Sequence, residues 1–412
     1  MAIVSQKLEK VIHGLAYEKI SGELTRNQSD PLLAKLKALG TEVWLDTGEL
    51  EKAQEIWRDE LTALTTNNTL ANQVVQSGVM DQVIADTIHE IRQESLDLSE
   101  EEMLLEVGFV INCKIALRLV QAFKVKVSVE LHPAVSRSIE RTLHFGRRYY
   151  NVCPEYFTIK VPLTPEGYLA VRTLRQEGIP INFTLGFSVR QNYLAARLSN
   201  PDFVNVFLGR LNQVVMDHKA GTGDLVGEKV TLATQQALRS ARENHEEVSS
   251  RLIAASIRNG AQVAFLAGLD VLTIPPKAMV EFQASGVSLL TSHIDDAIEP
   301  GIDPQHSLAK RFSELWQLSD EFKKFVELLV SLPELDAMQG KDLDAFANTQ
   351  GINLFHPFSD EDLLKIQDHG KIPNLNAWPE SVALDDLMTQ SALQSFTKDQ
   401  NALDERIRSF LK

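Results

Sequence analysis

A lysine lies in the middle of an apolar, β-rich run. Within the run FTIKV, Lys160 shares one strand face with Thr158 and opposes an apolar face, because successive strand residues point to opposite sides. Burial disfavours the charged form of a lysine and lowers its pKa below the reference of about 10.4. The resulting neutral amine can attack a carbonyl carbon and form a Schiff base, so Lys160 is a candidate nucleophile. A snorkelling or salt-bridged core lysine is the alternative.

Polar side chains recur late in other β-rich runs. Asp46 ends the run VWLD, Glu130 lies near the end of VKVSVEL, and Asn182 and Thr184 alternate with apolar residues in INFTLGF. A carboxylate within hydrogen-bond reach can move a proton and a hydroxyl can orient water, so this pattern predicts acid/base chemistry around the lysine. Taken singly, Asp46 could instead cap a helix that begins near Glu49, and Thr184 could be an ordinary strand residue.

Eight β-rich runs alternate with amphipathic segments between Thr41 and about Ser285, the pattern of parallel βα units. The runs are 43–46, 61–67, 125–131, 157–161, 181–187, 204–210, 252–257 and 271–276. Their number and spacing predict a (β/α)8 TIM barrel, whose active site would lie at the carboxyl ends of the strands. A doubly wound open sheet remains possible from the spacing alone.

Helical patterns flank the predicted barrel. Residues 1–40 are expected to form helices, including YEKISGEL and DPLLAKLKALG, and the strand signal disappears after about residue 290. In the tail, Ser359 and Asp362 resemble a capping box that opens a helix ending before Gly370. The predicted domains are an N-terminal helical segment (1–40), a catalytic barrel (41–290) and a helical C-terminal extension (291–412).

Composition excludes several classes of protein. The chain has 412 residues and a net charge of −15, without a Lys/Arg run, which argues against nucleic-acid and membrane partners. The two cysteines, Cys113 and Cys153, are isolated and the histidines are not clustered, so neither a disulfide framework nor a metal site is expected. The N-terminus lacks a secretory pattern, and charges interrupt the apolar stretch from Leu104 to Phe123. We therefore expect a cytoplasmic protein without a membrane span.

The motifs resemble those of the transaldolase family, in family order over about residues 41–285. FTIKVPLTPEG followed by INFTLGFSVRQ is similar to the Schiff-base strand and the next strand of that family. WLDTGEL, LTTNNTL, VSVELHP, NVFLGRLNQVV and AASIRNG followed by LAGLDVLTIPP resemble its other motifs. The GTGDLVG segment at 221–227 follows a helix, so we interpret it as a loop rather than a dinucleotide site.

The resemblance implies a role for each matching residue. Lys160 would form the imine, Asp46 would be the acid/base beside the bond that breaks, and Glu130 and Thr184 would handle water and protons. Further residues would contact the sugar or its phosphate: Asn67, Asn182, Arg210, Ser256, Arg258 and Phe207. Taken singly, Asn67 could be a turn residue, Ser256 a strand residue and Arg258 a surface arginine.

Four positions depart from the family pattern. Asn68 and Val206 stand where the family carries proline, Asn205 where it carries serine and Asn212 where it carries aspartate. These substitutions could reshape the rim that binds the sugar, but they leave the lysine and the two carboxylates unchanged.

The implied activity is that of a transaldolase in the pentose phosphate pathway. Such an enzyme transfers a dihydroxyacetone unit from sedoheptulose 7-phosphate or fructose 6-phosphate to glyceraldehyde 3-phosphate or erythrose 4-phosphate, without a diffusible cofactor. The alternatives are a fructose 6-phosphate aldolase and a sugar-phosphate-binding protein without catalysis. Glu130 and Phe207 favour transfer, because the aldolases tend to carry glutamine and tyrosine there. Monomer and homodimer both stay open. We also expect part of the tail to cover the barrel mouth and limit water access.

Overall fold

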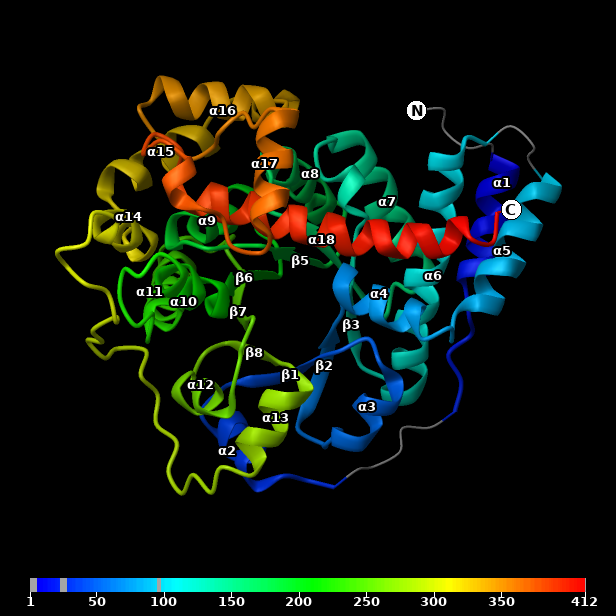
Figure 1. The fold of residues 1–412 in the computed structure, drawn as a ribbon, viewed down its shortest axis with the longest axis horizontal. Helices are drawn as coiled ribbons and strands as arrows, with labels where there is room; N and C mark the ends of the chain where they lie inside the picture. The colour runs from blue at the N-terminus through cyan, green and yellow to red at the C-terminus, as the bar shows by residue number, and fades with distance from the viewer. Residues whose placement is uncertain (1–5, 23–27, 95–97, 412) are drawn as a thin grey trace.

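The computed structural model describes residues 6–22, 28–94 and 98–411 and has a closed barrel of eight parallel strands at its centre (Figure 1). The strands are β1 (Glu42–Asp46), β2 (Leu61–Thr65), β3 (Lys126–Glu130), β4 (Phe157–Pro162), β5 (Ile181–Thr184), β6 (Phe203–Phe207), β7 (Arg251–Ala255) and β8 (Val271–Ile274). Each strand pairs with its sequence neighbours, and β1 pairs with β8. The predicted (β/α)8 barrel is therefore confirmed, and an open sheet is excluded.

Six of the eight strand runs end earlier than the sequence suggested, so that Asn67 and Ser256 lie just beyond β2 and β7, and the difference is largest in two runs. The run at 204–210 stops being a strand at Phe207, and Leu208 begins α10 (Leu208–Asp217), so Arg210 lies on a helix. Gly209 permits this sharp change, because a Cβ there would meet the Ser256 carbonyl oxygen at 2.3 Å. The run at 181–187 ends at Thr184, after which Leu185 has a positive φ of 69° and turns the chain away from the sheet.

Helices surround the barrel, as expected for a (β/α)8 fold. They are α3 (Leu50–Ile56), α4 (Asn68–Gln76), α5 (Asp81–Glu94), α6 (Glu100–Phe123), α7 (Ile139–Val152), α8 (Pro165–Gln176), α9 (Val189–Leu194), α10, α11 (Val226–Asn244), α12 (Gly260–Phe265) and α13 (Pro276–Gln283). A π-helical turn at Ala195–Ser199 continues α9, and a 3₁₀ turn at Pro133–Val135 follows β3. The 221–227 segment is a loop up to Leu225, and its last two residues open α11.

The most apolar segment is a buried helix, α6, as predicted. Its buried Glu106 forms a two-bond ion pair with Arg148 of α7, at 3.0 and 2.5 Å, and the guanidinium lies over the Phe109 ring. A buried charge needs such a partner to offset its lost hydration. None of the helices in the described ranges is long and apolar enough to cross a membrane.

The N-terminal helices are α1 (Gln6–Ala16) and α2 (Pro31–Ala38). The DPLLAKLKALG prediction is confirmed, since Asp30 caps α2. The YEKISGEL prediction is wrong for residues 17–22, which are not helical, and residues 23 and 24 lie outside the described part of the chain. The reason is tertiary: the Gln121 side chain accepts from the Ser21 N–H at 3.1 Å and donates to the Ser21 carbonyl at 2.7 Å, so both backbone groups bond outside a helix.

The C-terminal extension is helical, with α14 (Ala309–Ser313), α15 (Asp320–Val330), α16 (Gly340–Thr349), α17 (Asp360–His369) and α18 (Leu384–Arg408). 3₁₀ turns lie between them at Glu314–Trp316, Leu335–Ala337 and Leu375–Ala377. Ser359 and Asp362 form the predicted capping box of α17. The domain boundaries at residues 40 and 290 stay predictions.

The long helix α18 crosses the carboxyl ends of the strands (Figure 1). Thr389 of α18 donates a 2.9 Å hydrogen bond to the carbonyl of Leu185, just after β5. Further along, Gln400 accepts from Asn68 at 3.0 Å, after β2. Because these contacts lie on opposite sides of the mouth, the extension covers the end of the barrel where a (β/α)8 active site forms.

Candidate active site

Lys160 and Glu130 form a buried ion pair inside the barrel. The two residues are directly paired on β4 and β3, and Glu130 Oε2 lies 3.2 Å from Lys160 Nζ. Each residue is only 3% exposed, so the pair is shielded from bulk water. The ammonium also donates a 3.1 Å hydrogen bond to the Thr66 carbonyl. Lys160 therefore belongs to the salt-bridged class of core lysines, and its partner is a residue that can accept its proton.

Burial raises the pKa of Glu130, and the nearby Lys160 charge partly opposes that shift. Among the described residues, neither Glu130 oxygen accepts a hydrogen bond of good geometry, so the ion pair is its main stabilising contact. A carboxylate with a raised pKa is a better proton acceptor than an ordinary one.

Asp46 is the second carboxylate of the site. It ends β1, and Thr65 of β2 donates a 2.6 Å hydrogen bond to its Oδ1. Burial raises the Asp46 pKa, while Lys160, the Thr65 hydroxyl and Arg258 lower it. The capping alternative does not describe its role, because α3 begins after Glu49 and has no side-chain cap.

Four amide and hydroxyl side chains form a chain of hydrogen bonds inside the barrel. Asn205 of β6 donates to Asn182 Oδ1 at 2.7 Å and accepts from Thr184 Oγ1 at 3.3 Å. Asn182 in turn donates to the Ser128 hydroxyl at 3.1 Å and is paired with Lys160 across β4 and β5. All these groups are buried, so the network fixes their rotamers beside the lysine.

A cavity of about 210 Å³ opens above the lysine at the carboxyl ends of the strands. Seven of the ten predicted site residues line it: Asp46, Asn67, Lys160, Phe207, Arg210, Ser256 and Arg258. The remaining three do not line it, but Glu130 contacts Lys160, and Asn205 connects Asn182 and Thr184 to the cavity wall. Asn67 also caps α4, where its Oδ1 accepts from Leu70 N at 2.9 Å, so the turn alternative describes part of its role.

Two arginines from different elements converge on this cavity. Arg210 of α10 is 6% exposed, and burial together with repulsion from Arg258 lowers its pKa to about 10. Arg258 is more exposed, follows β7, and has a pKa lowered by desolvation. Among the described residues neither guanidinium forms an ion pair with a carboxylate. Two such guanidiniums on one cavity are suited to an anion such as a phosphate.

Ser256 precedes Arg258 in a strained turn after β7. Its φ is 63°, in the left-handed region that non-glycine residues rarely adopt. Such strain persists where the surroundings hold it, and here Gly209 packs directly against the Ser256 carbonyl. The turn thus exposes Ser256 and Arg258 to the cavity rather than continuing the strand.

Three of the four departures from the family pattern have partners in the structure. Asn68 donates to Gln400 of α18, and Asn205 joins the network around Asn182. Asn212 donates to Glu228 at 3.0 Å and accepts from Gly227 N at 2.6 Å, so an aspartate would face a like charge there. Val206 is fully buried in β6, and nothing in the structure explains its replacement of proline.

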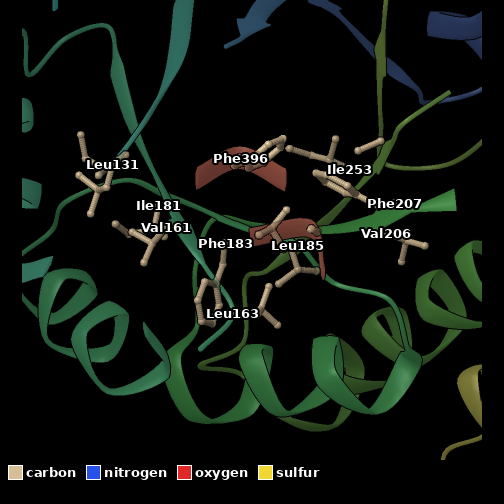
Figure 2. Packing of buried hydrophobic residues seen from close by; sticks show 14 of the residues in the cluster. Leu131, Val161, Leu163, Ile181, Phe183, Leu185, Val206, Phe207, Ile253 and Phe396 are labelled. Atoms are coloured by element: carbon tan, nitrogen blue, oxygen red, sulfur yellow. The ribbon is translucent and has the colours of Figure 1, made fainter. Parts of the chain in front are cut away.

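Several residues of the site were not predicted. Thr65 donates to Asp46 and shares a 2.6 Å hydrogen bond with Thr273 of β8. Their positions near strand ends were a signal that could have identified them. Lys371 and Phe396 also line the cavity, but they belong to the C-terminal extension, and no local pattern in the sequence connects them to it. Figure 2 shows Phe396 packed in the same apolar cluster as Phe207 and Ile253.

The arrangement brings together an amine, two carboxylates and two guanidinium groups. Lys160 can attack a carbonyl, Glu130 and Asp46 can exchange protons, and the arginines can hold an anion at the opposite wall. In the part of the chain that the structure describes, no group of three His, Cys, Asp or Glu residues is placed to hold a metal ion.

Comparisons with known proteins identify the family that the chain resembles. A family model described as transaldolase/fructose-6-phosphate aldolase matches residues 43–329, which extends beyond the predicted barrel boundary at 290. A probable transaldolase of Dictyostelium discoideum is 27% identical over 284 residues, 65% of this chain and 88% of that protein.

Two further relatives have similar coverage. A transaldolase of Kluyveromyces lactis is 26% identical over 309 residues, covering 72% of this chain and 86% of its own. A probable transaldolase of Thermus thermophilus is 31% identical over 238 residues, 57% of this chain and 86% of that one. The family model covers more than half of the chain. The chain belongs to the transaldolase/fructose-6-phosphate aldolase family.

Proposed function

We propose that the chain is a transaldolase that works through a Schiff base on Lys160. The donor is sedoheptulose 7-phosphate or fructose 6-phosphate, and the acceptor is glyceraldehyde 3-phosphate or erythrose 4-phosphate. The observation that carries this proposal is the buried Lys160–Glu130 pair beneath a cavity that is also lined by Asp46 and by two arginines, Arg210 and Arg258.

In the first step, the Lys160 amine attacks the ketose carbonyl and water leaves, which forms an imine. Glu130 is the proposed base that takes the ammonium proton, because its raised pKa and its 3.2 Å contact suit it to that exchange. Thr184, hydrogen-bonded to Asn205, is proposed to orient the water that leaves and later returns.

In the second step, Asp46 takes the proton of the hydroxyl beside the bond that breaks. The carbon–carbon bond opens, its electron pair moves toward the imine to give an enamine, and the aldose phosphate departs. The enamine then attacks the acceptor aldehyde, and water releases the new ketose. The reaction balances without a diffusible cofactor.

Substrate binding is assigned to the remaining residues. Arg210, Arg258 and Ser256 would hold the phosphate, and Asn67 and Asn182 would contact the sugar and imine. Phe207 would provide an apolar wall. We also propose that α18 limits water access to the enamine, since Phe396 of that helix lines the cavity. A cytoplasmic location accords with these substrates.

The closest alternative is a fructose 6-phosphate aldolase, which releases the dihydroxyacetone instead of transferring it. Glu130 and Phe207 favour transfer over this alternative. Product analysis distinguishes them: fructose 6-phosphate is supplied with and without erythrose 4-phosphate. We expect sedoheptulose 7-phosphate to form with the acceptor and little turnover without it. Free dihydroxyacetone as the main product would support the aldolase, and no reaction would support a binding protein.

A further inference from the structure

A turn of the C-terminal extension reaches the anion-binding end of the cavity. α17 ends at His369, and Gly370 has a φ of 84°, so the chain changes direction in a conformation that side-chain-bearing residues rarely adopt. The next residue, Lys371, lines the cavity together with Arg210 and Arg258. The turn therefore places a lysine at the rim of this end of the cavity.

The backbone of this turn is fixed from several sides. Arg210 Nη1 donates a 3.3 Å hydrogen bond to the Lys371 carbonyl. Ser391 of α18 donates to the Gly370 carbonyl at 3.1 Å, and the Leu375 N–H donates to His218 at 2.9 Å. These contacts join the turn to α10 and α18, so the position of Lys371 at the rim is set by the fold rather than by a free loop.

The charges that line the cavity are not balanced. Its lining includes four basic residues, Lys160, Arg210, Arg258 and Lys371, and one carboxylate, Asp46; Lys160 is paired with the buried Glu130. Among the described residues, no acidic side chain forms an ion pair with any of the other three cations. Arg210 and Arg258 repel each other, while Asp399 attracts Arg210 and Asp46 attracts Arg258, and a dianion bound beside them and Lys371 would offset the repulsion.

We propose that Lys371 is a third phosphate-binding cation and sets the preference of the site for phosphorylated over unphosphorylated sugars. The identity of the ligand as a sugar phosphate rests on the proposed function. Lys371 is exposed, so its ammonium stays hydrated in the free protein and pairs with the phosphate as a mobile point charge. Arg210 and Arg258 supply the directional hydrogen bonds.

The test compares Lys371→Met with Lys371→Arg in the full chain. Lys398→Met is the matched control, because Lys398 is an exposed lysine of the same extension and does not line the cavity. Titration with inorganic phosphate, followed by calorimetry, measures the site without relying on turnover. The Michaelis constant for fructose 6-phosphate is then compared with that for unphosphorylated fructose.

We expect Lys371→Met to weaken phosphate binding and to raise the Michaelis constant for fructose 6-phosphate by about tenfold, with kcat and the constant for fructose unchanged. Lys371→Arg should restore most of the affinity, and Lys398→Met should behave as wild type. Unchanged phosphate affinity in Lys371→Met would overturn the proposal, as would equal losses for both sugars or no phosphate binding by wild type. Borohydride trapping on Lys160 tests the proposed function separately, so the two failures are distinguishable.

Discussion

Glu130 lies directly opposite Lys160 on the neighbouring strand, with its carboxylate 3.2 Å from the ammonium. The barrel places both side chains in its interior, where desolvation raises the Glu130 pKa and keeps the pair in contact. In the proposed mechanism Lys160 must lose a proton before it can react, and Glu130 lies beside it as a group able to accept that proton.

Glu130→Gln tests this pairing. The amide occupies nearly the same space but cannot take a proton, so we expect kcat for transfer to fall by about 10²- to 10⁴-fold. Steady-state kinetics with fructose 6-phosphate and erythrose 4-phosphate measure the loss, and circular dichroism checks the fold. A variant with the wild-type kcat would show that Glu130 takes no part in proton transfer.

Asp46→Asn should change stability and activity in opposite directions. The folded-state pKa of Asp46 is raised, so the folded protein binds its proton more tightly than the unfolded chain does. In the wild type, the contribution of Asp46 to the free energy of unfolding is therefore fully present at pH values below the pKa of Asp46 in the unfolded chain. It is lost as the pH rises through the pKa of Asp46 in the folded protein.

The asparagine variant does not titrate at that position, so its stability relative to wild type should increase as the pH rises above the unfolded pKa of about 4. Urea unfolding at several pH values measures this difference. Transfer activity should fall at the same time by about 10²-fold or more, because the acid/base group is missing. A stability difference that shrinks with pH would contradict the assigned direction of the pKa shift.

Asn205→Ser introduces the residue that the family pattern carries at this position. The shorter side chain cannot reach both Asn182 and Thr184, so buried polar atoms lose their partners. We expect the free energy of unfolding to fall by about 1–3 kcal/mol. Urea denaturation measures the change, and Asn212→Ser serves as a comparison at another departure. A stability equal to wild type would mean that a water replaces the lost contacts.

Phe396→Ala tests whether α18 excludes water from the enamine. Removing the ring from the cavity wall should raise the fraction of dihydroxyacetone that is released rather than transferred, while Phe396→Leu should retain transfer. The readout is the ratio of free dihydroxyacetone to sedoheptulose 7-phosphate. If that ratio is the same in all three proteins, this ring does not control water access.

The barrel and the core of the site were predictable because their signals are local. Alternating residues in FTIKV already placed Lys160 opposite an apolar face, and Asp46 and Glu130 stood at equivalent ends of their own strands. In a closed parallel barrel those ends must meet, so the fold converts separate local patterns into one site.

The remainder depended on contacts between distant segments. Arg210 was expected on a strand, but helix α10 begins at Leu208, and the absence of a side chain at Gly209 lets this helix pack against the Ser256 carbonyl. Lys371 and Phe396 reach the cavity only because the extension folds back over the mouth. In the sequence, Asn68 was only a departure from a motif. In the structure it donates a hydrogen bond to Gln400, a residue 332 positions away in the chain.

Trapping of the covalent intermediate tests the central claim most directly. The protein is incubated with fructose 6-phosphate, reduced with borohydride and digested, and the modified peptide is identified by mass spectrometry. The Schiff-base mechanism predicts one reduced dihydroxyacetone adduct, located on Lys160, and none in Lys160→Arg, because a guanidinium stays protonated and cannot attack. An adduct on another lysine, or no adduct in an active preparation, would contradict the mechanism.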